Sequence, residues 1–290
     1  MKKFIYLLGA IAALTACGDD DEPYTPELNK LTNVTCTKNG VAFFQADITY
    51  DEQQRINRIV LNQEGTQSVD NYIFVDNTLS VSGTRTASGD AGTPFVHTRY
   101  TLSGNTITRK EEMAENPYAN HAVYTQTASS FQYNGNALRS VSQVIRSPLE
   151  GGSDYQTWDV GEVARYVWED GNVVYYDYLP EREMAYEYDT QLCPANFPFR
   201  VVDTFRPVDF AVVSPLNQMY GAMNRNLPSR AYWYAIASAS TVQATYAFHY
   251  TFTGDYITGM TVEEQLHPTD GTAAETNTYV YTFIYNFTVQ

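Results

Sequence analysis

The chain is organised by a short motif that recurs along most of its length. In each copy an aromatic or large apolar residue is followed, five positions later, by an aliphatic residue, with Asn, Asp, Gly, Ser or Thr mostly between them. The copies are Phe74–Leu79, Leu102–Ile107, Tyr133–Leu138, Trp168–Val173 and Phe252–Ile257, with a looser copy at Tyr50–Ile56. Asn, Asp and Gly tolerate the positive φ angles that tight hairpin turns require. The motif therefore predicts a series of β-hairpins with their turns at the centre of each copy.

Aromatic residues alternate with smaller or more polar ones in the predicted strands. They occupy every second position from Tyr246 to Phe252 and again from Tyr279 to Phe287. A period of two is typical of a strand with one buried face. Asn39-Gly40 predicts a further hairpin turn near the start of the domain. We therefore expect an all-β domain, an antiparallel meander of about 14 strands.

One Pro-rich segment between Val173 and Tyr246 breaks this rhythm and carries a helix signal. Ser214 is a suitable N-cap and Pro215 suits the first helical position. The apolar residues that follow have the i, i+3, i+4, i+7 spacing of one helix face: Leu216, Met219, Tyr220 and Met223. We predict a short helix near 215–224 that plugs one end of the curved sheet, with Asn217 on its exposed side. The opposite end is then the place to expect a ligand.

The first residues form a leader with a cysteine at its end. Lys2 and Lys3 precede the apolar run Phe4–Leu14, which is too short to span a bilayer, and Leu14-Thr15-Ala16-Cys17 resembles the lipobox of bacterial lipoproteins. The alternative is an ordinary secretory leader that ends near a cysteine by chance. We expect residues 1–16 to be a signal peptide, Cys17 to carry acyl chains such as palmitate, residues 17–30 to be a spacer, and 31–290 to form one domain.

An acidic run, Asp19 to Glu22, follows the cysteine. Such a run is normally a solvated spacer, and this one also resembles the export signal of surface-exposed Bacteroidetes lipoproteins. The two interpretations are compatible, and they predict an outer-membrane location, with exposure at the cell surface. The formal net charge is −15, and loss of Lys2 and Lys3 with the leader makes it more negative. A charge of this sign disfavours nucleic acid as a partner.

The residues that usually carry chemistry form no recognisable motif. His97, His121, His249 and His267 have no metal-ligand spacing, and no nucleophile elbow occurs, so we predict no metal, cofactor or catalytic residue. Cys36 and Cys193 either pair in a disulfide or are small buried apolar residues. Paired carboxylates of a glycosidase remain an alternative because they come from separate strands. Candidates are Glu162, Glu169, Glu187 and Glu263.

The aromatic surplus allows two interpretations. Aromatic stripes at period two are usually core, but aromatic rings can also stack on sugars. Trp158 and Trp233 are the better candidates for a glycan site because both lie outside the hairpin motif.

Taken together, the features resemble a family of Bacteroidetes lipoproteins described as a domain of unknown function with a porin-like fold. The residues that carry the resemblance are Cys17 with its acidic run, the hairpins at Tyr133–Leu138, Trp168–Val173 and Phe252–Ile257, and the stretch from Gly221 to Asn226-Leu227-Pro228. The resemblance implies a rolled, barrel-like sheet and no particular activity.

A porin that spans a membrane would show an outward apolar band on its strands. Here charged residues lie within or beside the predicted strands, namely Arg58, Arg109, Glu111, Arg139 and Arg146. We therefore expect a porin-like but soluble barrel. The function that fits best is non-enzymatic binding of a ligand, such as a glycan, or of a surface protein. The alternatives are a glycan-active hydrolase and a purely structural subunit.

Overall fold

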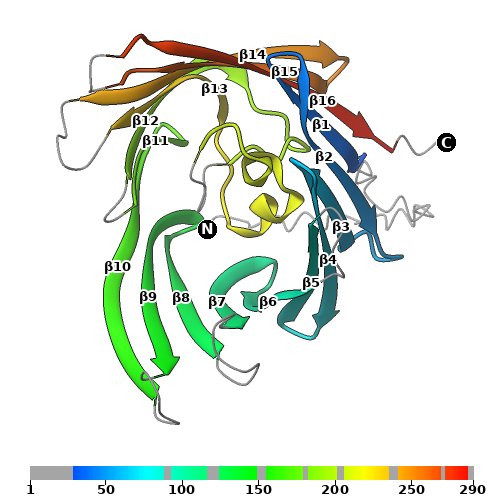
Figure 1. Ribbon diagram of the computed structural model, residues 1–290, viewed down its shortest axis with the longest axis vertical. Coiled ribbons are helices and arrows are strands. Elements are labelled where there is room, and N and C mark those ends of the chain that lie inside the picture. The colour runs from blue at the N-terminus through cyan, green and yellow to red at the C-terminus, as the bar shows by residue number, and fades with distance from the viewer. Residues whose placement is uncertain are drawn as a thin grey trace, which may run out of the picture.

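The fold is a single closed barrel of antiparallel strands. The computed structural model describes residues 29–87, 93–115, 124–148, 155–178, 182–200, 206–234, 241–268 and 272–286. Each strand pairs with its neighbours in the chain, and β1 pairs with β16 to close the ring (Figure 1). The strands are β1 Leu31–Lys38, β2 Val41–Tyr50, β3 Ile56–Gln63, β4 Thr66–Val75, β5 Thr78–Ala87, β6 Thr93–Ser103, β7 Thr106–Glu115, β8 Tyr124–Asn134, β9 Ala137–Pro148, β10 Tyr155–Glu169, β11 Asn172–Tyr178, β12 Arg182–Leu192, β13 Asn226–Tyr234, β14 Val242–Thr253, β15 Tyr256–Leu266 and β16 Glu275–Tyr285.

The all-β meander is confirmed, and the described strands number 16 where the sequence predicted about 14. The barrel-like closure that the family resemblance implied is also confirmed. The expected signal peptide, Cys17 and most of the acidic spacer lie outside the described residues.

The recurring motif has a simple structural meaning. Its first and last residues are cross-strand partners in all five copies, as in Phe74↔Leu79 and Trp168↔Val173. The turns between them contain positive φ angles, such as 49° at Asp170 and 82° at Gly171. Since each turn joins an even-numbered strand to the next one, all of these hairpins lie at the same end of the barrel.

Much of the inner face of the barrel is apolar. The alternating aromatic residues predicted on β14 and β16 point inward and are buried, among them Tyr246, Phe248, Tyr279 and Tyr281. Aromatic rings pack edge to face across the interior, with Phe44 5.8 Å from both Tyr281 and Phe210. The core is therefore inside the ring of strands, where these side chains meet a segment that does not belong to the wall.

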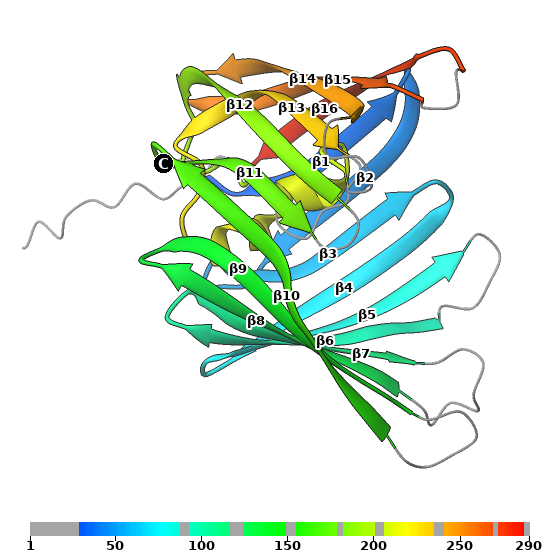
Figure 2. The ribbon, with the colours of Figure 1, turned by 90° about the vertical axis from the view of Figure 1, so that its left-hand side faces the viewer.

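That segment is the connection between β12 and β13, and we call its described parts, residues 193–200 and 206–225, the plug. It enters the ring at the hairpin end and fills part of the interior (Figure 1 and Figure 2). Several of its apolar residues are fully buried, including Phe197, Phe199, Val208 and Val212. Backbone hydrogen bonds join it to the rim, from Ala222 to Asn136 O (2.7 Å) and from Arg225 to Gly171 O (2.9 Å).

The helix predicted in the plug is shorter and tighter than expected. It begins at Pro215 after Ser214, as predicted, but it is a 3₁₀ helix that ends at Met219, preceded by a second one over Phe210–Val213. Gly221, at φ +84°, passes so close to Asn136 O that any side chain would collide with it. Contact with the β8–β9 turn therefore ends the helix early.

The change of helix type also changes which side chains are buried. Because a 3₁₀ helix has three residues per turn, the 3.6-residue stripe does not apply. Tyr220 is buried as predicted, whereas Leu216 and Met219 are only partly buried. Asn217, expected on the exposed side, is 3% exposed. Its side-chain amide donates hydrogen bonds to Pro198 O and Ala211 O, both at 2.9 Å. The exposed position predicted for Asn217 was wrong.

Cys36 and Cys193 are both free thiols, of which Cys36 is buried and Cys193 is partly buried. Burial raises the pKa of Cys36 to about 12, although a hydrogen bond with Tyr281 lowers it. Burial also raises the pKa of Cys193 to about 12.

In the described part of the chain, none of the helices has the length and apolar character of a membrane span.

Asn217 should be essential to the shape of the plug. We expect Asn217→Ala to lower the free energy of unfolding by about 1–3 kcal/mol, because it removes two hydrogen bonds and leaves a buried carbonyl without a donor. Chemical denaturation measures the change. The matched control is Gln218→Ala, since the neighbouring Gln218 is exposed and makes only a 3.5 Å contact with Ala195 O. Equal stabilities of the two variants would contradict this role.

The thiols should be protected in the folded protein. At about pH 8 a thiol with a pKa near 12 is almost entirely protonated. We expect iodoacetamide to label neither Cys36 nor Cys193 until the protein is unfolded in urea, after which both should react without a reducing agent. Labelling in urea that requires prior reduction would instead demonstrate a disulfide.

Candidate ligand-binding site

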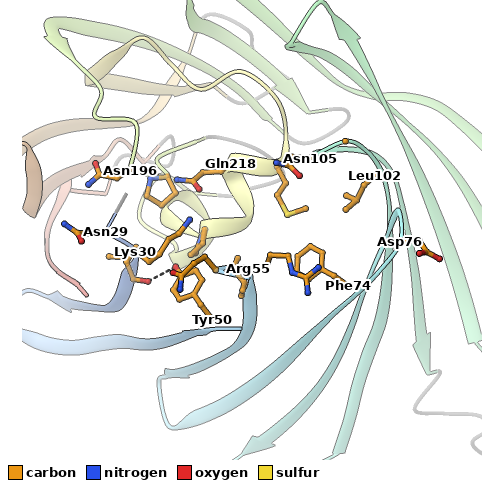
Figure 3. A pocket seen from close by; sticks show the side chains of 17 residues that line it. Asn29, Lys30, Tyr50, Arg55, Phe74, Asp76, Leu102, Asn105, Asn196 and Gln218 are labelled. Carbon is orange, nitrogen blue, oxygen red and sulfur yellow. Dashed lines mark hydrogen bonds between the residues drawn. The ribbon is translucent and has the colours of Figure 1, made fainter. Parts of the chain in front are cut away.

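The clearest cavity lies at the plugged end of the barrel. It has a volume of about 310 Å³ and opens between the plug and three neighbouring hairpin turns (Figure 3). The turns contribute Gln54 and Arg55, then Asp76, then Gly104 and Asn105. The plug and the start of the described chain complete its wall through Asn196, Pro198, Pro215, Gln218, Met219, Asn29 and Lys30. The sequence interpretation placed a ligand at the opposite end, where a larger hollow of about 600 Å³ lies along β1–β4.

One side of the cavity is apolar and built from the hairpin motif itself. Phe74 and Leu102 are the first residues of two motif copies, and Tyr50 begins the looser copy. The Tyr50 hydroxyl donates to Leu31 O at 2.8 Å (Figure 3). Burial raises the pKa of Tyr50 well above its ordinary value, so this phenol stays neutral. Its hydroxyl is already engaged, and Tyr50 can therefore offer a ligand mainly its ring.

Arg55 is held in place at the mouth of the cavity. Its guanidinium lies 4.8 Å from the centre of the Phe74 ring. It also pairs with Asp51, with one nitrogen 2.7 Å from the carboxylate. These two contacts fix the direction of the guanidinium. The remaining N–H groups of a planar guanidinium are directed donors for an oxygen-bearing ligand.

Neutral amides supply most of the polar lining. Five amide side chains line the cavity, those of Asn29, Gln54, Asn105, Asn196 and Gln218. Each amide can donate and accept hydrogen bonds. Asp76 is the one carboxylate among the lining residues. The cavity therefore suits a compact ligand with one apolar face and several neutral polar groups, and it lacks the pair of carboxylates that glycoside hydrolysis needs.

The predicted tryptophans lie elsewhere. Trp158 is on β10 and is 42% exposed, whereas Trp233 is on β13 and packs against the core. Strands β11 and β12 separate their strands, and neither residue lines the cavity. The structure thus does not bring the two together into one platform.

The carboxylates proposed for a hydrolase are spread over the outer wall. The four glutamates are all exposed and line neither of the two cavities described above: Glu162, Glu169, Glu187 and Glu263. Glu162 pairs with Arg165, and Glu187 accepts a hydrogen bond from Tyr232 at 3.0 Å. The described residues also contain no cluster of His, Cys, Asp or Glu suited to a metal ion.

An ion pair between a partly exposed arginine and a buried glutamate, which sequence reasoning missed, joins the plug to the wall. Arg206 of the plug lies 2.6 Å from the Glu264 carboxylate, which is fully buried. Tyr279 and Asn277 each donate to the same carboxylate at 3.1 Å. A signal for Glu264 was present in the sequence, because it falls on the inward face of β15 in register with Met260 and Val262. Its neighbour Glu263, the candidate from the sequence, points outward.

Comparison with known proteins gives the family and the fold. The family described as "Domain of unknown function (DUF5032)" matches residues 18–290, and a prokaryotic membrane lipoprotein lipid attachment site matches residues 1–17. The chain is therefore a membrane-anchored lipoprotein. No curated protein matches it.

Two solved structures share the fold. A porin-like protein from Bacteroides uniformis aligns with a TM-score of 0.54 and 12% identity, over 88% of this chain and 98% of its own. A porin-like protein from Bacteroides vulgatus aligns with a TM-score of 0.53 and 12% identity, over 89% of this chain and 99% of its own. At this identity the likeness concerns the fold alone.

Proposed function

The chain belongs to the DUF5032 family, whose description names no activity, and we propose from its cavity that it is a surface lipoprotein that binds a small polar ligand without transforming it. The observation that carries this function is the cavity of about 310 Å³ between plug and rim. Its amides and the fixed Arg55 offer directed hydrogen bonds beside the Phe74 ring. Pockets that combine an apolar wall with a few placed polar groups are typical of small-molecule sites.

A glycan is the ligand class that we favour. A sugar presents an apolar ring face and many hydroxyls, which match an aromatic wall and a set of amides that donate and accept. Hydrolysis is not favoured, because Asp76 is the one carboxylate among the residues that line the cavity. A purely structural role does not account for a cavity with this lining.

The location that we propose is the outer face of the outer membrane. The lipid attachment match ends at Cys17, and Asp19 to Glu22 follow directly. Asn29, at the plugged end, is 12 positions after Cys17. An extended chain of that length reaches at most about 40 Å. The plugged end with its cavity is therefore the end next to the tether.

We further propose that the barrel stands in water beside the membrane and does not span it. Exposed charged residues lie on the outer wall of several strands, including Arg58, Arg99, Arg109, Arg139 and Arg165. Much of its inner face is apolar. A barrel that spans a bilayer has the reverse arrangement, with an apolar outer band and a polar interior.

Lipidation and surface exposure can be tested separately. Mass spectrometry of the mature protein should find an acylated Cys17, and Cys17→Ala should leave an unprocessed or soluble product. Unchanged membrane partitioning of Cys17→Ala would exclude the anchor.

Changing Asp19, Asp20, Asp21 and Glu22 to Ala should reduce protease accessibility on intact cells while lipidation persists. Wild-type protein that is already inaccessible on intact cells would contradict the surface location.

Glycan binding should depend on the cavity. On a glycan array the wild-type protein should bind a subset of oligosaccharides, and Phe74→Ala should weaken that binding by roughly tenfold or more through loss of stacking. Because Phe74 also contacts the core, Asn105→Ala on an exposed turn provides a second variant that leaves the core intact. Trp158→Ala and Trp233→Ala are the matched controls outside the cavity. Binding that survives both cavity variants, or that follows the tryptophans, would place the site elsewhere.

A further inference from the structure

The outer wall of the barrel carries a row of uncharged polar side chains across four neighbouring strands. Residues directly opposite each other in adjacent antiparallel strands point to the same face of a sheet. The strand pairing places four such residues opposite one another in turn, and we call them the polar row: Thr35 of β1, Gln45 of β2, Asn62 of β3 and Gln67 of β4. The row points outward, because Phe44, next to Gln45, faces the interior.

A hollow of about 600 Å³ lies over this row. All four members of the polar row line it, together with Thr37 and Ala42, the next outward pair on β1 and β2. Cys36 and Phe44 also border it, yet their side chains are only 1% and 4% exposed. No described residue of the plug lines it. The hollow is therefore on the outer side of the wall, separate from the cavity between plug and rim.

The lining of this hollow is almost free of charge. Glu64, at the β3–β4 turn, is the one charged residue among those that line it. Elsewhere the outer wall carries charged pairs, such as Arg109 with Glu111 and Glu162 with Arg165. The whole chain has a formal net charge of −15 and repels anionic ligands, and the polar row offers an ion no counter-charge. The hollow therefore suits an uncharged partner.

The amides of the polar row keep hydrogen-bonding groups available for a ligand. The Gln67 amide donates to Asn62 Oδ1 at 2.9 Å, which holds the two side chains in place. This bond leaves the amide N–H groups of Asn62 and the side-chain carbonyl of Gln67 without a partner among the described residues. Gln45 turns its amide nitrogen toward Asp47, at 3.3 Å, and keeps its carbonyl oxygen. The row thus presents both donors and acceptors, as a ligand with many hydroxyl groups requires.

We propose that the polar row binds an extended, uncharged polysaccharide chain that lies across strands β1 to β4. Adjacent strands are about 4.8 Å apart, which is close to the repeat of one sugar unit in an extended pyranose chain. Successive sugars can therefore meet successive members of the row, each through its hydroxyl groups. This site is distinct from the cavity at the plugged end, which takes a compact ligand.

Calorimetric titration with cellohexaose, mannohexaose and xylohexaose tests the proposal, because these uncharged chains are extended. The wild type should bind at least one of them roughly tenfold more tightly than the disaccharide of the same sugar, which spans only two strands. Maltohexaose, whose chain coils, should bind more weakly, and a hexamer of galacturonic acid should not bind because it is anionic. Changing both Gln45 and Asn62 to Ala should weaken binding of the hexasaccharide by roughly tenfold or more.

The matched control is Gln132→Ala, because Gln132 is likewise exposed on a strand, β8, but lies away from the polar row. It should bind the hexasaccharide as the wild type does. Failure of the wild type to bind any of the three extended hexasaccharides would overturn the proposal. So would binding that is lost in Phe74→Ala but not in the double variant, since the chain would then occupy the cavity. A dimer of the wild type that the double variant dissociates would overturn it too, because the row would then be a contact between two copies of this chain.

Discussion

Sixteen tilted strands enclose a space too wide for the side chains on their own inner faces to fill. Barrels of this size hold a channel or a plug, and the many apolar side chains on the inner face of this one favour a plug that covers them. The chain between β12 and β13 solves this problem by entering the ring and bringing Phe197, Phe199 and Val212 against the wall. The barrel and its plug therefore depend on each other, because neither can bury its apolar surface alone.

The candidate ligand-binding site follows from the imperfect fit between plug and wall. Where the short 3₁₀ helix at Pro215–Met219 approaches the turns of three hairpins, a cavity remains, lined by the rings of the hairpin motif and by amides of the plug and rim. Deeper inside, the plug carries two arginines to the wall. Arg206 meets the buried Glu264, whereas Arg200 meets aromatic rings. The plug thus provides both the core of the barrel and the polar groups that make its interior chemically distinctive.

The arrangement also gives the barrel a direction. The first described residues, Asn29 and Lys30, line the cavity at the plugged end, and Asn286 exchanges hydrogen bonds with Lys30 there. Both ends of the described chain therefore meet beside the cavity. Because the residues before Asn29 carry the tether, we propose that this end of the barrel is the one next to the anchor.

Local physical chemistry allowed the sequence alone to determine the hairpins. The pairs Phe74↔Leu79 and Trp168↔Val173 were predicted from turn residues and alternation, since both signals act within about ten residues of chain. The leader and its terminal cysteine are equally local, as is the start of the plug helix at Pro215. Closure of the ring, by contrast, came from a family resemblance, because the pairing of β1 with β16 joins residues at opposite ends of the domain.

Only the tertiary structure decided what the plug does. The β8–β9 turn at Asn136 ends the plug helix, and the carbonyl groups of Pro198 and Ala211 hold the Asn217 side chain in a buried position. Strand β15 places Glu264 beside Arg206. These contacts depend on the path of a segment through the barrel, and no local pattern of residues encodes that path.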